Sequence, residues 1–339
     1  MQDSPGALIG CFVYFFIKNY QNISGCTSTC SEKLVIDTDA GADDATGILL
    51  VLSAWIHDDS NFELIAITCT YGNTVEENVQ QNVLKTLTIA NATHIPVYGG
   101  AQKPLANNYT SDNYFGKDGF GDFVMDEKIT AKVNDSYKAA VALVNLAKNY
   151  PKELNILALG PLTNIALAIS LDANFVHNVK KFYIMGGSVT GLGNYSPGVE
   201  YNFACDPVSN FIVLQSMIKP SMLYPWETVV QSNISKKWRM DKLGSIDSKI
   251  IRFLNKAEDI SLSAVSTWRP ADAMAAAAMM WPKLINKSEV LNVMAVMDGE
   301  AKGSLLVDYY NVTGKLKNVE IVQNLNIEAF QDKILHHFS

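Results

Sequence analysis

Four aspartates that are close enough to act together lie near the start of the chain. They fall within eight positions on either side of Gly41: Asp37, Asp39, Asp43 and Asp44. Carboxylates packed this closely repel one another, so either their pKa values rise or a cation neutralises them. Hard oxygen ligands that converge on one point suit calcium or magnesium. The alternative interpretation is that these residues are solvated caps and turns.

A strand, a glycine turn and a helix are the elements that would position these acids. An apolar run at residues 34–36 precedes them, and a helix-like apolar run at 45–52 follows them. Side chains alternate along a strand, so Asp37 and Asp39 would point to the same side of its end. The later pair of aspartates would lie in the first helical turn, where the helix dipole favours negative charge. We expect this helix to run to about His57.

The acidic turn also carries a resemblance to a known family. Residues 37–45, DTDAGADDA, resemble the N-terminal signature D-x-D-P-G-x-D-D of the inosine-uridine-preferring nucleoside hydrolases. Ala40 stands where that signature has proline. Later segments match the same family, and the resemblance covers roughly residues 33–330.

Alternating strand and helix patterns indicate a parallel α/β sheet. The β-rich runs are residues 62–70, 95–98, 154–159 and 182–185. Helical stretches include 75–90, 136–148 and, in the last third of the chain, 248–266. The resemblance implies a single-domain, Rossmann-like nucleoside hydrolase fold, with an open, mixed, mostly parallel sheet and helices on both faces. We take residues 31–339 as this domain.

The resemblance also implies roles for residues near the strand ends. In the family, an asparagine after the second strand faces the ribose, and Asn73 matches it. The backbone carbonyl just before a G-P-L-T-N segment binds the metal there, and Leu159 matches it. The last metal-binding aspartate of the family corresponds to Asp272. The substrate-binding loop that begins at M-G-G is matched by four residues: Met185, Asn194, Glu200 and Asn202.

Together these matches imply calcium-dependent hydrolysis of the N-glycosidic bond of a ribonucleoside to ribose and a free base. The Ca²⁺ ligands would be Asp39, Asp44, Asp272 and the Leu159 carbonyl. Asp39 would be the general base that takes a proton from a metal-activated water. Asp43 would bind ribose, and Asp37 would fix the turn. Carboxylates and the Asn73 carbonyl would stabilise a transition state that resembles an oxocarbenium ion.

The residue expected to protonate the leaving base is missing. Inosine-uridine-preferring members have a histidine directly before the last metal-binding aspartate, and this chain has Ala271. Phe115, in the irregular segment 107–128, stands where a mobile loop of the family often contributes a histidine. This segment is either a lid over the site or a surface loop. A purine can be protonated by solvent or assisted by stacking, so we expect purine nucleosides to be preferred. Trp268 either packs in the core or stacks on the base.

Other functional classes compete with the hydrolase. A non-catalytic nucleoside- or ribose-binding protein on the same fold would explain the missing histidine. A haloacid-dehalogenase-type phosphatase also has D-x-D after a strand, but that motif needs threonine or valine where this chain has Gly41. A purely structural secreted glycoprotein would leave the acidic turn without a purpose.

The N-terminus differs from the rest of the chain, and we expect residues 1–30 to be a signal peptide or an N-terminal extension. The apolar run at residues 7–17 is too short for an ordinary spanning helix and fits a signal-peptide core. N-glycosylation sequons begin at Asn22, Asn91, Asn108, Asn134, Asn194, Asn233, Asn286 and Asn311. Both features favour secretion, and the alternative is a cytoplasmic protein.

Composition limits the partners. The chain of 339 residues is 48% hydrophobic, carries a net charge of -7 and has no basic block, so nucleic acid is not an expected partner. We expect no stable membrane span and a small-molecule nucleoside as substrate. Family members are commonly dimers or tetramers, so the resemblance implies a homo-oligomer. Cys69 is expected to be a buried thiol, while disulfides among the other cysteines stay possible.

Overall fold

The computed structural model describes residues 31–106 and 108–339. The expected signal peptide or extension at residues 1–30, which includes Cys26 and Cys30, lies outside the described residues. Residues 32–339 form one compact unit.

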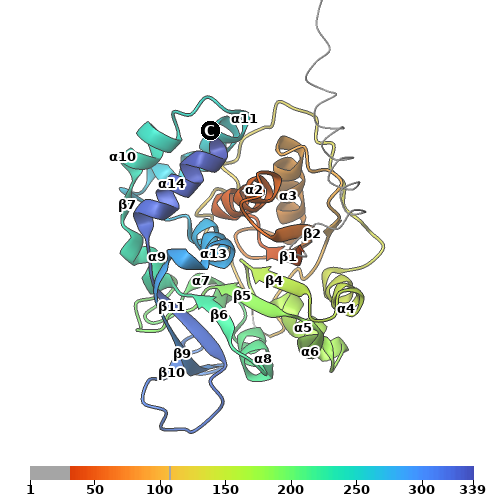
Figure 1. Cartoon of the computed structure of the whole chain (residues 1–339), viewed down its shortest axis with the longest axis vertical. Coiled ribbons are helices and arrows are strands. Elements are labelled where there is room, and N and C mark those ends of the chain that lie inside the picture. Colours follow the sequence, from red (N-terminus) through yellow and green to blue (C-terminus); the bar gives the residue numbers. More distant parts are fainter. Residues whose placement is uncertain (1–30, 107) are drawn as a thin grey trace, which may run out of the picture. The chain divides into compact units, whose positions relative to one another are not determined.

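Within the described residues, a nine-stranded sheet runs in the order β10-β9-β11-β6-β5-β4-β1-β2-β3 (Figure 1). Its strands are β1 (Glu32–Thr38), β2 (Phe62–Cys69), β3 (Val97–Tyr98), β4 (Leu154–Ala158), β5 (Lys181–Met185), β6 (Ser221–Tyr224), β9 (Ile285–Ala295), β10 (Leu305–Asp308) and β11 (Val319–Leu325). Neighbours from β11 to β3 pair in parallel, whereas β9 pairs antiparallel with both β10 and β11. The prediction of a mixed, mostly parallel sheet is therefore confirmed. A separate two-stranded ribbon joins β7 (Ile234–Ser235) and β8 (Thr267–Trp268).

Helices cover both faces of this sheet, as expected (Figure 1). The helices that cover one face are α2 (Ala42–Ile56), α3 (Glu76–Ile89), α9 (Trp226–Ser232), α11 (Lys249–Ala257), α13 (Ala271–Met280) and α14 (Ile327–Phe338). Those of the other face are α4 (Ala139–Asn149), α5 (Thr163–Leu171), α6 (Phe175–Asn178) and α8 (Pro207–Ser216). Short helical segments are α7 (Tyr201–Cys205), α10 (Lys236–Trp238), α12 (Asp259–Ser263), a π-helical turn Arg239–Leu243 and a 3-10 turn Pro282–Leu284.

The pattern of β1 explains why two layers of helices form. Leu34 and Ile36 pack into the apolar cluster that contains α2 and α13, whereas Val35 packs into the cluster that contains α4 and α5. All three side chains are fully buried. A parallel strand that is buried on both faces has no polar face, which accounts for its continuous apolar run. The polar residues of β1 are thereby confined to its carboxyl end.

The helical stretch expected over residues 248–266 is confirmed over most of its length. It forms two adjoining helices, α11 and α12, which are separated at Glu258. The Glu258 side chain turns inward, where its Oε1 accepts a hydrogen bond from Nε1 of Trp268 at 2.6 Å. Its Oε2 accepts from Nε of Arg239 at 2.6 Å. No local pattern in the sequence reveals these tertiary contacts at the junction of the two helices.

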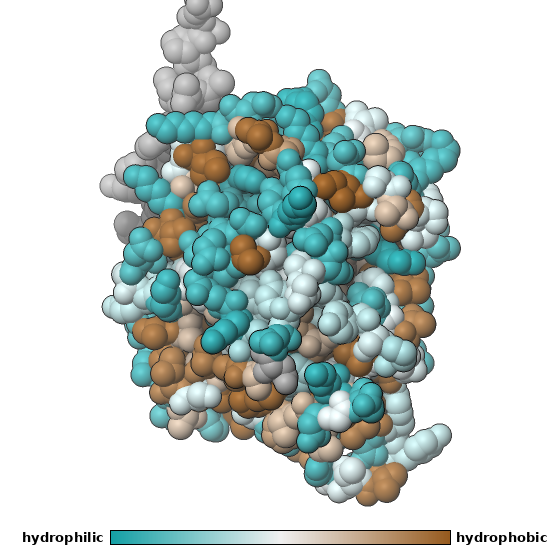
Figure 2. Space-filling view, turned by 180° about the vertical axis from the view of Figure 1, so that it is seen from behind, coloured by the Kyte–Doolittle hydropathy of each residue, from teal (hydrophilic) through white to brown (hydrophobic). Residues whose placement is uncertain are grey.

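The visible surface is mixed in character. Figure 2 shows polar side chains over much of the face opposite to that of Figure 1, with apolar side chains between them. No helix of the described chain combines the length and apolar character needed to cross a bilayer. Cys69 is a buried free thiol, as predicted, and Cys205 is buried and free as well. None of the sequon asparagines in the described residues is buried: Asn91, Asn108, Asn134, Asn194, Asn233, Asn286 and Asn311.

Candidate active site

The acidic turn lies where β1 ends and α2 begins, and the start of a distant helix meets it there. Because α13 packs against α2, Asp272 in the first turn of α13 comes beside Asp43 and Asp44. One carboxylate oxygen from each of the three lies within 4.8 Å of the others. The fold therefore gathers three carboxylates at the N-termini of two helices, whose dipoles favour negative charge.

Two of these carboxylates have buried oxygens without a hydrogen-bond donor, namely Oδ1 of Asp43 and Oδ1 of Asp272. Loss of water around Asp43, followed by the charge of Asp44, raises its pKa to about 8. Burial and the charge of Asp43 raise the pKa of Asp272 well above its usual range. An ionised carboxylate only accepts hydrogen bonds, so in the charged form such oxygens need a proton or a cation as their partner. The cluster can hold a metal ion.

Asp44 is anchored on both of its oxygens. Oδ1 accepts a hydrogen bond from Oγ1 of Thr38 at 2.5 Å. Oδ2 accepts from the backbone N–H of Gly41 at 2.9 Å and from the side-chain amide of Asn73 at 3.3 Å. Burial raises the pKa of Asp44 to about 6. Asn73, which was expected to face the ribose, thus lies directly at the acidic cluster.

Asp39 is fully enclosed at the end of β1, and its neighbours must be glycines. A Cβ atom on Gly72 would lie 2.0 Å from Oδ2 of Asp39, and a Cβ atom on Gly160 would lie 2.9 Å from its backbone nitrogen. Oδ2 of Asp39 accepts a hydrogen bond from the backbone N–H of Asn73 at 2.8 Å. Burial and the charge of Asp44 raise its pKa well above the usual range.

The three clustered carboxylates share Asp44 and Asp272 with the predicted metal ligands, and the ligand set itself stays a prediction. The three clustered carboxylates include Asp43, which was expected to bind ribose, and not Asp39. The Asp39 carboxylate is bonded to the Asn73 N–H in the turn after β2. Asp37, in turn, accepts bonds at Oδ1 from Thr68 at 2.5 Å and from the Asn164 amide at 2.8 Å, which links β1 to its neighbours.

Leu159, Met185 and Asn202 come together at the carboxyl ends of β4 and β5. The Leu159 carbonyl accepts a hydrogen bond from Nδ2 of Asn202 at 2.7 Å, while its N–H donates to the Asp37 carbonyl at 2.8 Å. Nδ2 of Asn202 also lies 3.5 Å from the carbonyl oxygen and from Sδ of Met185. These residues follow β4, end β5 and lie in α7, so three elements converge on the predicted Leu159 carbonyl ligand.

Glu200 and Asn194 have structural partners that the sequence did not predict. The buried Glu200 carboxylate accepts from the backbone N–H groups of Gly187, Asn202 and Phe203 at 2.8, 2.9 and 3.1 Å. Burial raises its pKa to about 7. Asn194 is exposed, and its Oδ1 accepts from the Tyr201 N–H at 2.8 Å. Both side chains therefore shape the loop after β5, and their expected contacts with ribose stay predictions.

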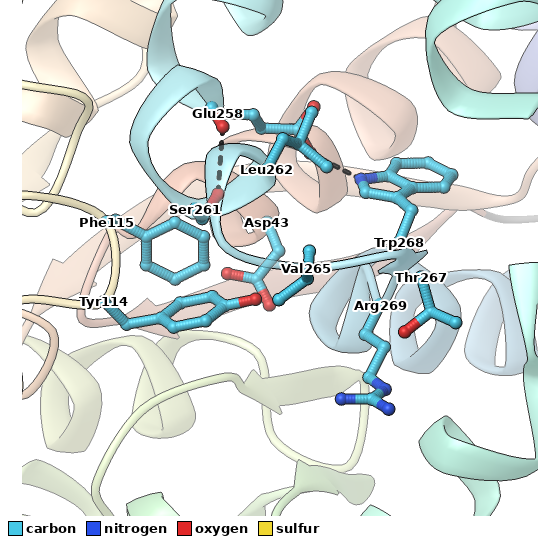
Figure 3. A pocket seen from close by; sticks show the side chains of 10 residues that line it. All are labelled: Asp43, Tyr114, Phe115, Glu258, Ser261, Leu262, Val265, Thr267, Trp268 and Arg269. Atoms are coloured by element: carbon cyan, nitrogen blue, oxygen red, sulfur yellow. Dashed lines mark hydrogen bonds between the residues drawn. The ribbon is translucent and has the colours of Figure 1, made fainter. Parts of the chain in front are cut away.

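A pocket opens beside Asp43, and Figure 3 shows the residues around it. Its free space is about 10 Å³, the room of about one water molecule. Its lining residues are Asp43, Tyr114, Phe115, Glu258, Ser261, Leu262, Val265, Thr267, Trp268 and Arg269. A nucleoside base would require this space to widen.

The irregular segment around Phe115 covers the acidic turn. The ring lies so close to Gly41 that a Cβ atom there would meet it at 2.9 Å. Ser111 Oγ donates to the Asn73 carbonyl at 2.6 Å, and Tyr109 Oη donates to the Thr74 carbonyl at 2.9 Å. Of the two interpretations, a segment lying over the site is the one that the structure shows.

The aromatic and charged residues of the pocket include several that sequence reasoning missed. Trp268 is buried, as the core interpretation expected, yet it also lines the pocket and stacks on Trp238 at 6.0 Å between ring centroids. Its neighbour Glu258 is held by the fully buried Arg239. Tyr114 adjoins Phe115 in the sequence, so this aromatic pair was the available signal. Nothing in the local sequence indicated Glu258 or Arg239.

Several known proteins are similar to this chain. The chain is 38% identical over 187 residues to the probable uridine nucleosidase 1 of Oryza sativa subsp. japonica, covering 55% of this chain and 56% of that protein, so the match spans about half of the relative. It is 29% identical over 308 residues to the pyrimidine-specific ribonucleoside hydrolase RihA of Shigella flexneri serotype 5b, covering 88% and 96%. A solved inosine-guanosine nucleoside hydrolase superposes with a TM-score of 0.82 at 27% identity, covering 91% and 98%.

The family profile described as inosine-uridine preferring nucleoside hydrolase matches residues 34–332. That range contains every strand from β2 to β11, the acidic turn and Asp272. The chain belongs to the inosine-uridine preferring nucleoside hydrolase family.

Proposed function

We propose that this protein hydrolyses the N-glycosidic bond of ribonucleosides, with calcium as its metal and purine nucleosides as the preferred substrates. The observation that carries the proposal is the cluster of Asp43, Asp44 and Asp272, in which two buried carboxylate oxygens lack a donor. A structural protein would have no reason to keep acceptors in this state, because each one disfavours folding. A cation site next to a pocket explains them.

The chain's oxygen atoms fit a hard divalent cation. We propose Asp39, Asp44, Asp272 and the Leu159 carbonyl as its ligands, and the position of Asp43 makes it a further candidate. When bound, calcium would orient a water molecule and lower its pKa.

The protein's own side chains would then act on the water and the sugar. Asp39, enclosed by Gly72 and Gly160, would accept the proton of the attacking water as the general base. Asp43, which faces the pocket, would accept a hydrogen bond from a ribose hydroxyl. Asn73 holds both Asp39 and Asp44 and would set the distance between the base and the metal site.

Substrate contacts farther from the metal follow from the loop after β5. Asn202 lies against the Leu159 carbonyl, and we propose that it and Met185 contact the ribose. Glu200 and Asn194 hold this loop in place, and we propose the same sugar contacts for them, as the family resemblance implies.

The purine preference rests on the lack of a histidine at Ala271. The names of two relatives point the other way, since they describe uridine and pyrimidine nucleosidases, while the solved neighbour is described as acting on inosine and guanosine. Inosine and uridine are therefore the decisive pair of substrates. We expect a higher kcat/KM for inosine, and a clear preference for uridine would contradict the purine proposal.

The test is release of reducing sugar from inosine, adenosine, guanosine, uridine and cytidine, measured after chelation and again with added calcium. The variants are Asp39→Ala and, as a matched control, Asp332→Ala in α14, which is exposed and remote from the cluster in sequence. Calcium-dependent activity that Asp39→Ala abolishes and Asp332→Ala retains is the expected result. Nucleoside binding by the folded, calcium-loaded protein without any cleavage would instead establish the non-catalytic binding protein.

A further inference from the structure

The departing base needs a group that stabilises it, and no histidine of this chain is placed to do so. Ala271 is a methyl group at the start of α13, and no histidine lines the pocket. His57, His336 and His337 contact one another where α2 meets α14, while His94 and His177 are exposed elsewhere. If the proposed hydrolysis occurs, another side chain must take over this task.

Two of the polar residues around the pocket are unsuited to it. Glu258 accepts bonds from Arg239 and Trp268, and its negative charge would repel a base that gains electrons. Burial and the charge of Asp43 raise the pKa of Tyr114 to about 12. The Tyr114 hydroxyl therefore keeps its proton at neutral pH and is a poor acid.

Arg269 carries the positive charge that Glu258 and Tyr114 lack. Its N-terminal neighbour Trp268 lines the pocket with it, and a bond from the Ala271 N–H to the Arg269 carbonyl at 2.9 Å tightens the turn before α13. The guanidinium lies over the ring of Trp226, 5.7 Å from its centroid. Stacking on an indole face holds an arginine in place and leaves its N–H groups available at the edge.

The three arginines of the chain differ in how they are engaged. Arg239 is fully buried against Glu258, and Arg252 pairs with Asp247 on the surface. Within the described residues, no carboxylate lies within ion-pair distance of Arg269. Figure 3 shows its side chain on the side of the pocket away from Glu258. Arg269 is thus a pocket cation that no acid in the described part of the chain neutralises.

We propose that Arg269 binds the leaving base and stabilises the negative charge that it gains, and that it selects 6-oxopurines over adenine. This inference rests on the proposed nucleoside hydrolysis. A guanidinium presents parallel donors that match two adjacent acceptors, N7 and O6, in hypoxanthine and guanine. Adenine offers N7 but has a donor amine at position 6. Arg269 would therefore favour inosine and guanosine over adenosine.

The step balances without a proton from arginine. Water oxygen bonds to C1′ while the C1′–N9 bond breaks, and the electron pair of that bond passes to the base. The proton of the water goes to the Asp39 carboxylate. The base leaves as an anion hydrogen-bonded to Arg269 and takes a proton from solvent, while Asp39 returns its proton to solvent. The guanidinium keeps its protons throughout and acts only as a hydrogen-bond donor.

The experiment compares substrates whose leaving groups differ in how much stabilisation they need. The substrates are inosine, adenosine and p-nitrophenyl β-D-ribofuranoside, whose phenolate leaves readily without assistance. The variants are Arg269→Ala, Arg269→Lys and the surface control Arg252→Ala, each tested for folding by thermal melting. Loss of a charged hydrogen bond that forms in the transition state predicts about a 10- to 100-fold lower kcat for inosine in Arg269→Ala.

The pattern across substrates identifies the role. We expect Arg269→Ala to cleave the nitrophenyl riboside within about twofold of the wild-type rate, to lose most of its preference for inosine over adenosine, and to regain inosine cleavage on addition of guanidinium. Arg269→Lys should lie between the two. Equal losses of kcat on inosine and the nitrophenyl riboside would overturn the role assigned to Arg269 but not the hydrolase proposal. A wild-type protein that cleaves neither substrate would overturn the hydrolase proposal itself.

Discussion

Replacing Gly72 by alanine is the sharpest test of how the site is built. Gly72 follows β2, and the new Cβ atom would lie 2.0 Å from Oδ2 and 2.7 Å from Cγ of Asp39, whereas ordinary contacts fall at 3.4–4 Å. No positive φ is involved at this position, so the change probes close approach and not backbone strain. Either Asp39 or the turn must move.

The turn is poorly able to move. The Gly72 carbonyl accepts from Oη of Tyr201 at 2.8 Å, and its N–H donates to the Thr74 carbonyl at 3.1 Å. We therefore expect the Asp39 side chain to be displaced and its bond with the Asn73 N–H to break. Overpacking of this kind destabilises folded proteins by about 1–3 kcal/mol. A shift of about 1 Å in a general base lowers the rate about 100-fold.

The assay pairs thermal melting with inosine hydrolysis in saturating calcium. Gly314→Ala is the matched control, because Gly314 has a φ of 62° and no atom within 4 Å of an added Cβ. The control should lose about 1 kcal/mol through left-handed backbone strain and keep its activity. Gly160→Ala, with contacts of 2.9–3.0 Å to Asp39, should fall between the two variants.

The reasoning would be refuted by a Gly72→Ala protein that melts like wild type and retains activity within about twofold. That outcome would mean that Asp39 has room which the structure does not show. An equal loss of activity in Gly314→Ala would also refute it, since general destabilisation would then explain both results.

Three further predictions concern other parts of the fold. Ala40 has a φ of 35° and its N–H donates to Oγ1 of Thr38. Ala40→Pro should therefore unfold at a lower temperature, although the family signature has proline there, and Ala40→Gly should gain about 1 kcal/mol in the free energy of unfolding. Equal melting temperatures of the wild type and both variants would contradict this. Asp272→Asn should raise the Tm of the calcium-free protein by about 2 °C by removing a buried charge. It should also abolish the increase in Tm on addition of calcium, and an unchanged increase would exclude Asp272 as a ligand. Burial lowers the pKa of His337 despite its bond to Asp59. Its contribution to folding stability is therefore complete above about pH 6.5 and is lost as pH falls below that value. The melting temperature of calcium-loaded His337→Asn should depend less on pH between 7 and 5 than that of the wild type, and parallel pH curves for the two proteins would refute the assignment.

The local order of the fold was readable from the sequence. The predicted strand at residues 62–70 is β2, and the helix expected to reach about His57 is α2, which ends at Ile56. Such elements are encoded by neighbouring residues, through apolar periodicity and turn chemistry. The helical stretch expected over residues 248–266 is present as α11 and α12, but the contacts of Glu258 with Arg239 and Trp268 at their junction are tertiary and could not be predicted.

The acids of the turn could be recognised for the same local reason, since four of them lie within eight positions. Which carboxylates share a cation site was a different matter. The family resemblance implied Asp39, Asp44 and Asp272, and the packing of α13 on α2 is what brings Asp272 to Asp43 and Asp44.

The sequence by itself determined the kinds of chemical group in this protein and the order in which strands and helices present them. The tertiary structure alone decided which groups meet: the segment that carries Phe115 lies over the acidic turn, and Glu258, Trp268 and Arg269 line one pocket. The physical reason is that spacing along the chain sets only local direction, whereas proximity between distant residues depends on how helices pack across the sheet.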